Sequence, residues 1–186
     1  MKFNELDLVQ NSPEWETWRN QGIGASDAPT IMRENKFKSP GQLLHEKKNS
    51  IRPRKNIKMI TGSKLEGRAR LSYIRQFSVQ VSPLCVESID YPWLRASLDG
   101  ISEDRSHLVE IKCGESAYNQ ARRRIVPKYY YGQLQHQLML TGLNTIQYWC
   151  FWTTGPGIRI PVQRNDQYIK RLFAEEEKFF NLLTTP

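Results

Sequence analysis

Apolar side chains recur along the chain at two spacings, one typical of helices and one typical of strands. In residues 61–77 an apolar side chain returns at every fourth position from Leu65 to Phe77, which predicts a helix with one face on a core. Residues 166–183 show a comparable pattern, and their acidic run at 175–177 is expected to lie on a solvated face. Both segments therefore predict helices packed against another layer.

Three further helices carry start or stop signals. Ser12 and Pro13 suit the N-cap and the first helical position of "NSPEWETWRNQG". In the following "GIGASDAPTIM", Ser26 is placed to cap a second, short helix. The last of the three is expected over residues 128–140, where Gly142 ends it.

Short segments rich in β-branched and aromatic residues alternate with turns in the middle and near the end of the chain. Pro83 and the pair Tyr91-Pro92 separate the central segments, and residues 155–157 mark a hairpin turn. The order of elements predicts a single α+β domain over residues 1–186, with a mixed central β-sheet flanked by helices. The expected strands are residues 78–82, 85–89, 93–101, 108–113, 145–152 and 157–163.

The charge of the chain points to a polyanionic partner. Its 27 Lys and Arg residues outnumber 19 Asp and Glu residues, for a formal net charge of +8. Residues 45–58 combine many basic side chains with few apolar ones and are expected to form a basic loop, and residues 122–124 are three consecutive arginines. Either cluster could bind the phosphates of a nucleic acid, and each such contact would steepen the slope of log affinity against log salt concentration by about 0.9. Alternatively, either cluster could serve only as solubilising charge.

The cysteines and the hydropathy of the chain predict the cellular compartment in which the protein is located. Cys85, Cys113 and Cys150 are far apart and form no C-x-x-C pair, which argues against a disulfide framework and against structural zinc. The first ten residues are polar and interrupted by acids, and no apolar run approaches the length of about 18 residues that a membrane span needs. We therefore expect a cytoplasmic protein with reduced thiols and no membrane association.

The segment "SLDGISEDRSHLVEIKCG" sets two acids and a lysine on a predicted hairpin. A turn centred on Asp104 and Arg105 would place Asp99 directly across from Glu110, with Cβ atoms about 5 Å apart, where like charges destabilise a sheet. Alternation puts Lys112 on the same face as Glu110. Something must offset this repulsion.

A divalent cation would offset the repulsion between Asp99 and Glu110. Two carboxylates beside a backbone carbonyl suit Mg²⁺ or Mn²⁺, and Lys112 would be placed to hold or deprotonate an attacking water. The alternative is an exposed hairpin in which Glu110 and Lys112 form a surface ion pair worth less than about 1 kcal/mol. The apolar residues of "LVEIKC" favour a buried central strand, and Gly100 could introduce a bulge that shifts the register.

These residues also carry a family resemblance. "SLDG" followed by "VEIKC" resembles the D-(x)n-E-x-K core of the PD-(D/E)xK nuclease superfamily. "WETWRNQGIGASDAPTIM" resembles the N-terminal motif of the phage lambda exonuclease/YqaJ family of viral recombinases. "GSKLEGRARLSY" is similar to the helix with the upstream acid of that family, and "YYYGQLQHQLMLTG" to its Q-x-Q helix. Together these blocks span about residues 12 to 150.

The resemblance implies a restriction-endonuclease-like fold and a 5′-to-3′ exonuclease that digests one strand of linear duplex DNA. It further implies a homotrimeric ring, a single-strand annealing protein as partner, and a phage- or prophage-encoded origin in a bacterial host. By position, Asp99, Glu110 and the carbonyl of Ile111 would bind Mg²⁺, Glu66 would support this ion or a second one, and Lys112 would be the catalytic lysine.

The same resemblance implies a pocket for the 5′-phosphate. Arg19, Ser26, Ser97 and Gln133 match that pocket, and Gln133 and Gln135 match the Q-x-Q pair. A salt bridge with Arg70 is the structural alternative for Glu66. Because residues two apart do not share a helix face, we expect only Gln135 of the glutamine pair to reach the catalytic site.

The chain departs from the family pattern at two positions. Leu98 stands where the family often has proline, which changes the turn before Asp99. Met59 occupies the position of a strand-separating wedge, although it could equally be a core residue. Two other functions use the same features: a structure-specific or restriction-type DNA endonuclease, and a non-catalytic module that binds DNA ends.

Overall fold

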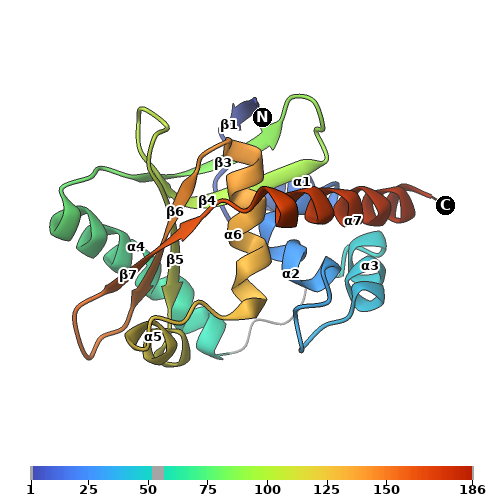
Figure 1. Ribbon diagram of the computed structural model, residues 1–186. Helices are drawn as coiled ribbons and strands as arrows, with labels where there is room; N and C mark the ends of the chain where they lie inside the picture. The colour runs from blue at the N-terminus through green and yellow to red at the C-terminus, as the bar shows by residue number, and fades with distance from the viewer. Residues whose placement is uncertain (1, 52–56, 186) are drawn as a thin grey trace.

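A mixed sheet runs through the centre of the computed structural model, which describes residues 2–51 and 57–185, apart from the side chains of 57–59 (Figure 1). In the part described, the strand order is β1-β3-β4-β5-β6-β7, with β2 alongside β4. Strand pairs β5–β6 and β2–β4 are parallel and the others antiparallel, so the predicted mixed α+β arrangement is confirmed. The strands are β1 (Phe3–Leu6), β2 (Ile23–Gly24), β3 (Ser82–Ser88), β4 (Leu94–Ile101), β5 (Leu108–Cys113), β6 (Thr145–Phe151) and β7 (Ile158–Gln163).

Helices cover both faces of this sheet and extend past one end of it (Figure 1). A 3₁₀ turn at Ala25–Asp27 leads into the second helix. No helix in the described ranges is long and apolar enough to cross a membrane. The α-helices are α1 (Pro13–Asn20), α2 (Ala28–Ile31), α3 (Pro40–Lys48), α4 (Ile57–Phe77), α5 (Glu115–Arg122), α6 (Lys128–Thr141) and α7 (Asp166–Thr184).

Strand β5 separates two hydrophobic cores. Leu108 packs into the larger core with Leu134 and Leu138 of α6. Val109 and Ile111 point to the opposite face and pack into a second core, which contains Ala69 and Tyr73 of α4 together with Trp149 of β6. This alternation leaves Glu110 and Lys112 on the α6 face of the strand.

The predicted helix signals at Ser12 and Gly142 are confirmed. Ser12 caps α1 by accepting a hydrogen bond from the backbone N–H of Trp15 at 3.2 Å. Gly142 ends α6 in the left-handed conformation, with φ of 75°. The expectation for Ser26 was wrong: it lies inside the 3₁₀ turn, where Asp27 Oδ2 accepts the N–H of Gly24 at 3.0 Å.

Three other expectations need correction. Residues 78–81 are not a strand, since β3 begins at Ser82 and runs on through Pro83. Helix α5 was not foreseen, and neither was α3, whose capping box between Ser39 and Gln42 could have revealed it. The expected basic loop at 45–58 begins in α3 and ends in α4, and its residues 52–56 lie outside the described part of the chain.

The acidic run of α7 is not solvated throughout. Glu176 is fully buried, and its Oε1 lies 2.8 Å from Nδ1 of His136. The other ring nitrogen of His136, Nε2, lies 2.9 Å from the carbonyl oxygen of Arg95. Burial raises the pKa of Glu176 against the opposing effect of His136. A buried histidine therefore holds α7 to α6 and β4.

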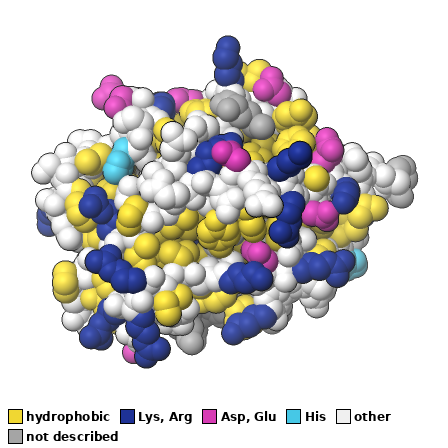
Figure 2. Space-filling view, viewed as in Figure 1, with side chains coloured by type: hydrophobic (Ala, Val, Ile, Leu, Met, Phe, Trp, Pro, Cys, Tyr) yellow, Lys and Arg dark blue, Asp and Glu magenta, His cyan; other side chains and the backbone are white. Residues whose placement is uncertain are grey.

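Lys and Arg side chains are spread over the lower part of the face shown in Figure 2, with hydrophobic side chains between them. The surface thus carries the positive charge expected from the composition.

Candidate active site

Strand β4 has an open stretch along one edge. Strand β3 pairs with β4 along its length, so β2 and β5 both lie along the other edge. There β2 pairs with Leu94 and Arg95, and β5 pairs with Gly100 and Ile101. Among the described strands, none pairs with this edge of β4 between these two contacts. In this stretch the groups of β4 bond to side chains instead of to a strand, as where Gln10 Nε2 donates to the carbonyl oxygen of Leu98 at 3.2 Å.

A β-bulge in β4 places Asp99 at this opening. Ser82 pairs with Ile101 and Leu84 with Leu98, so two residue steps in β3 face three in β4. A bulge is therefore present at Gly100, but it lies in the pairing with β3 and does not shift the register with β5. Gly100 fits there because a Cβ atom would lie 3.0 Å from Val81 Cγ2.

The pairing of Gly100 with Val109 has the predicted register of the β4–β5 hairpin, but the pairing ends there, so the expected direct pairing of Asp99 with Glu110 is not formed. One residue further along, Asp99 Oδ2 accepts a hydrogen bond of 2.8 Å from the backbone N–H of Ile111. From the opposite side, Arg70 Nε donates to the carbonyl oxygen of Asp99 at 2.7 Å. The carboxylate of Asp99 is thereby held in the fork between the two strands.

Glu110 is the most buried acid of the site, with 1% of its side chain exposed. Its Oε1 accepts hydrogen bonds from Lys112 Nζ at 2.5 Å and from Gln133 Nε2 at 2.7 Å. Its Oε2 accepts from Gln137 Nε2 at 2.5 Å, and Lys112 Nζ also reaches Gln133 Oε1 at 3.1 Å. This burial excludes the exposed surface ion pair, because a buried carboxylate must be satisfied by charged or polar partners.

The charges of the site perturb one another. Burial, followed by the negative charges of Glu110 and Glu66, raises the pKa of Asp99 well above its usual value, while Lys112 opposes the rise. Burial alone would lower the pKa of Lys112, but the charges of Glu110 and Asp99 outweigh it and raise that pKa. Lys112 is therefore a cation near neutral pH, which favours holding a water or phosphate over removing a proton.

The donor set fits a hard divalent cation that keeps most of its ligands as water and phosphate. The described residues contain no cluster of three or more His, Cys, Asp or Glu side chains that could hold a metal. Asp99 and Glu110 supply two carboxylates, and a bound cation would offset both the burial and the repulsion by Glu110 that raise the pKa of Asp99. Mg²⁺ is commonly bound through one or two carboxylates plus substrate phosphate.

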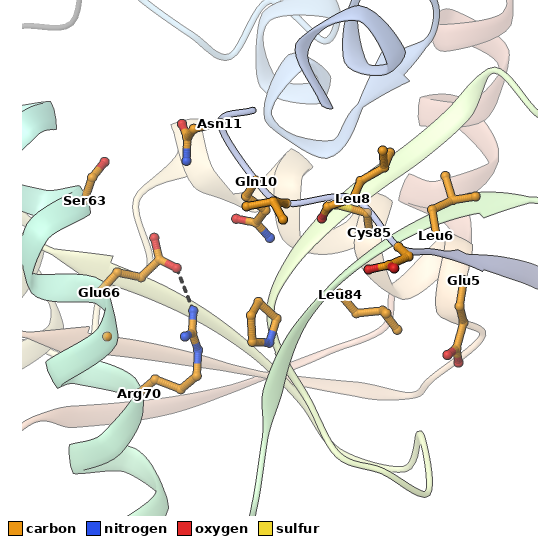
Figure 3. A pocket seen from close by; sticks show the side chains of 14 residues that line it. Glu5, Leu6, Leu8, Gln10, Asn11, Ser63, Glu66, Arg70, Leu84 and Cys85 are labelled. Carbon is orange, nitrogen blue, oxygen red and sulfur yellow. Dashed lines mark hydrogen bonds and ion pairs between the residues drawn. The ribbon is translucent and has the colours of Figure 1, made fainter. Parts of the chain in front are cut away.

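Glu66 is connected to Asp99 by hydrogen bonds through Arg70. Its Oε1 accepts a hydrogen bond of 2.7 Å from Arg70 Nη2, the i,i+4 ion pair considered as the structural alternative (Figure 3). Both side chains line a cavity of about 710 Å³ together with Ser63, and the N-terminal segment and β3 form its other walls. Glu66 thus orients the arginine that holds the backbone of Asp99.

Three of the four predicted phosphate-binding residues lie near Trp15 of α1, whereas the fourth, Gln133, contacts Glu110 and Lys112 instead. Trp15 Nε1 donates to Ser97 Oγ at 2.7 Å, and the Arg19 guanidinium carbon lies 5.3 Å from the centre of the Trp15 ring. Arg19 Nη2 donates to Ser26 Oγ at 2.5 Å. Ser97 precedes Asp99 by two residues on β4, so this group adjoins the fork.

The prediction that Gln135 reaches the site was wrong. Gln135 is fully buried on another face of α6, where its Nε2 donates to the carbonyl oxygen of Gln163 and its Oε1 accepts the N–H of Asn165, both at 2.9 Å. Gln133 and Gln137 reach Glu110 instead, because residues four apart share a helix face. Gln137 was missed, although its spacing from Gln133 could have revealed it.

A buried ion pair behind the phosphate-binding group was also missed. Lys47 Nζ of α3 lies 2.9 Å from Asp27 Oδ2, with 5% and 6% of the two side chains exposed. Lys47 also donates to the carbonyl oxygens of Gly22 at 2.8 Å and Arg19 at 3.2 Å. The pair fixes the segment between α1 and α2, with Arg19 in the last turn of α1 at one end and Ser26 in the 3₁₀ turn at the other.

Similarity to solved structures identifies the class of fold. An alkaline exonuclease from Laribacter hongkongensis superposes with a TM-score of 0.79 at 22% identity, over 92% of each chain. The same exonuclease in complex with dAMP gives a TM-score of 0.80. A phage-related exonuclease from Haemophilus somnus 129PT gives 0.64 at 10% identity, over 88% of this chain and 95% of that one. The chain thus has the α+β fold of these exonucleases.

Sequence comparison identifies the family. Residues 14–144 match the YqaJ-like viral recombinase domain, and the chain belongs to that family. It is 25% identical over 192 aligned positions to the uncharacterized protein YqaJ of Bacillus subtilis (strain 168), an alignment that covers 94% of this chain. The chain spans 58% of the length of that relative.

Proposed function

We propose that the protein is a divalent-metal-dependent 5′-to-3′ exonuclease that digests one strand of linear duplex DNA and leaves a 3′ single-stranded tail. The observation that carries the proposal is the buried Glu110–Lys112 pair beside Asp99, at the open edge of β4. Family membership and a shared fold with exonucleases support it, as does the dAMP complex of one of them.

The residues of the chain have separable roles in phosphodiester hydrolysis. Asp99, Glu110 and the carbonyl of Ile111 would hold Mg²⁺ or Mn²⁺, with Glu66 beside a second ion or acting through Arg70. When bound, such an ion activates water and stabilises the leaving oxygen. Lys112 stays protonated and binds an oxygen of the scissile phosphate or the attacking water, while Gln133 and Gln137 keep Glu110 in place.

The test is digestion of linear duplex DNA with Mg²⁺ or with EDTA, beside covalently closed circular DNA. We expect mononucleotides from the linear DNA with Mg²⁺ only, and an intact circle. Cleavage of the circle would indicate an endonuclease of the same fold. Binding without digestion under every metal condition would indicate a module that only binds DNA ends.

Replacement of Arg19 by alanine should mainly remove the preference for 5′-phosphorylated ends. Arg19 is a half-buried cation next to Ser26 and 3.7 Å from Asp27, which suits charge-assisted binding of a terminal phosphate. We expect the ratio of digestion rates for phosphorylated and hydroxyl ends to fall at least about tenfold, since a charged hydrogen bond contributes about 1.5–3 kcal/mol. Equal digestion of both ends by the unmodified protein would contradict the assignment.

Gln137→Ala and Gln135→Ala form a matched pair on α6. Gln137→Ala should lower the digestion rate by about 10- to 100-fold, because Glu110 Oε2 loses its donor. Gln135→Ala should instead lower the melting temperature with little change in rate, because Gln135 joins α6 to the segment between β7 and α7. The reverse pattern in rates would return the catalytic role to Gln135.

The remaining assignments are proposals suggested by the family resemblance. We propose a homotrimeric ring that encloses the duplex, a single-strand annealing protein as partner, and a phage- or prophage-encoded protein that acts in the host cytoplasm. The basic residues 122–124 would contact the phosphates of the duplex.

A further inference from the structure

A continuous series of aromatic rings leads from the surface to the catalytic lysine. Lys112 Nζ lies 4.7 Å from the centre of the Tyr130 ring, and the Tyr129 and Tyr130 rings are 4.6 Å apart. The Phe37 ring lies 6.5 Å from that of Tyr129, edge to face. Tyr129 and Tyr130 are in the first turn of α6, and Phe37 belongs to the loop between α2 and α3, which lies beside that turn.

Phe37 is presented to solvent by a fixed loop. Its side chain is 78% exposed, which is unfavourable for a large apolar ring. Its backbone N–H donates to Asn35 Oδ1 at 2.9 Å, and Asn35 Nδ2 donates to Thr30 Oγ1 at 2.9 Å. Gln120 Nε2 fixes the neighbouring ring by donating to Tyr129 Oη at 3.2 Å. The backbone at Phe37 and the ring of Tyr129 are therefore held in place before any ligand arrives.

The charge around these rings suits a phosphate backbone. Lys36 and Lys128 are exposed, and within the described part of the chain neither forms an ion pair. Lys36 Nζ lies 5.3 Å from the centre of the Phe37 ring. Aromatic rings with cations beside them are what proteins use to bind single-stranded nucleic acid, because every base can stack and every linkage carries a charge.

We propose that Phe37, backed by Tyr129, is a stacking site for an unpaired nucleobase of the DNA end held at the catalytic site. The inference rests on the proposed nuclease function and adds a binding site to it. The contacts from Phe37 through Tyr129 and Tyr130 to Lys112 place the stacked base a few nucleotides from the scissile phosphate. Such a site would bind an unpaired strand at the end of the duplex, independent of base identity.

The test measures DNA affinity in EDTA, so that no digestion occurs. The probes are a short duplex with an unpaired thymidine tail, the same duplex with a tail of abasic sites, and a blunt duplex. We expect Phe37→Ala to weaken binding of the thymidine-tailed duplex about 5- to 100-fold. Binding of the abasic-tailed and blunt duplexes should hardly change, because their phosphates are intact.

Two variants serve as controls. Phe37→Trp keeps a stacking surface and should bind the thymidine tail as the parent does. Ile89→Ala removes another exposed apolar side chain, 48% exposed, on the loop after β3 and should have no effect. Equal affinity of Phe37→Ala and parent for the thymidine tail would overturn the proposal. So would a change of oligomeric state in Phe37→Ala without loss of DNA affinity, since Phe37 would then contact protein.

The result is independent of the nuclease assay. Digestion without any Phe37-dependent binding would refute the stacking site and leave the nuclease proposal standing. Phe37-dependent binding without digestion under any metal condition would refute the nuclease and leave the stacking site standing.

Discussion

Asp99→Asn should lower the rate of DNA digestion by about 10³-fold or more while DNA affinity in EDTA stays within about twofold. Asparagine keeps the size of the side chain and an oxygen for the N–H of Ile111, but it removes the charge that would bind a cation. The basic surface that attracts DNA is unchanged. Digestion and affinity measured on the same labelled linear duplex would show the separation.

The folded state should tolerate this change. The pKa of Asp99 is raised in the folded protein by burial and by Glu110 and Glu66, so the ionised side chain opposes folding at neutral pH and the neutral asparagine does not. The melting temperature in EDTA should therefore not fall. Asp104→Asn, an exposed residue of the turn, is the control and should keep full activity. Loss of DNA affinity in step with activity would contradict the assigned role.

Lys47→Met should lower the free energy of unfolding by about 3–5 kcal/mol, the largest effect on stability that we expect. Methionine fills the volume but leaves the buried carboxylate of Asp27 without its partner at 2.9 Å. The carbonyl oxygens of Gly22 and Arg19 also lose a donor. Urea denaturation measures the change, and Asp27→Asn in the same chain should recover part of it. A loss below about 1 kcal/mol would show that the pair is solvated.

The pH dependence of this stability difference follows from the direction in which the pKa of Asp27 is shifted. Burial alone would raise the pKa of Asp27, but Lys47 and Arg19 outweigh it, so the folded pKa lies below the usual value. This contribution to stability is present above about pH 4 and is lost as the pH falls through the folded pKa. In Lys47→Met, protonation of Asp27 relieves the unpaired charge. The difference between the two proteins should therefore shrink on acidification.

Local patterns predicted the strand that carries Glu110 and the register of its hairpin. The apolar residues on either side of Glu110 indicated a buried strand, and the turn at Asp104 and Arg105 fixed the pairing of Gly100 with Val109. These features depend on neighbours in sequence, which is why they could be read without a structure. The bulge at Asp99 and Gly100 could be suspected from the glycine alone.

Contacts between elements that are distant in sequence were harder to predict from the sequence. The choice between Gln133 and Gln135 depends on which face of α6 meets β5, and the helix is buried on several faces. Glu176 sits in an acidic run that looks solvated, and only its packing on His136 shows otherwise. The pairing of Lys47 with Asp27 joins two segments that sequence spacing does not relate. Each of these contacts is decided by tertiary packing.

The central claim is that Asp99 and Glu110 together bind a divalent cation at the fork between β4 and β5. Calorimetric titration of the DNA-free protein with Mn²⁺ tests it most directly. We predict that the parent protein binds Mn²⁺ and that Asp99→Asn loses this binding while Asp104→Asn retains it. Equal Mn²⁺ binding by the parent and Asp99→Asn, or none by the parent, would contradict the account.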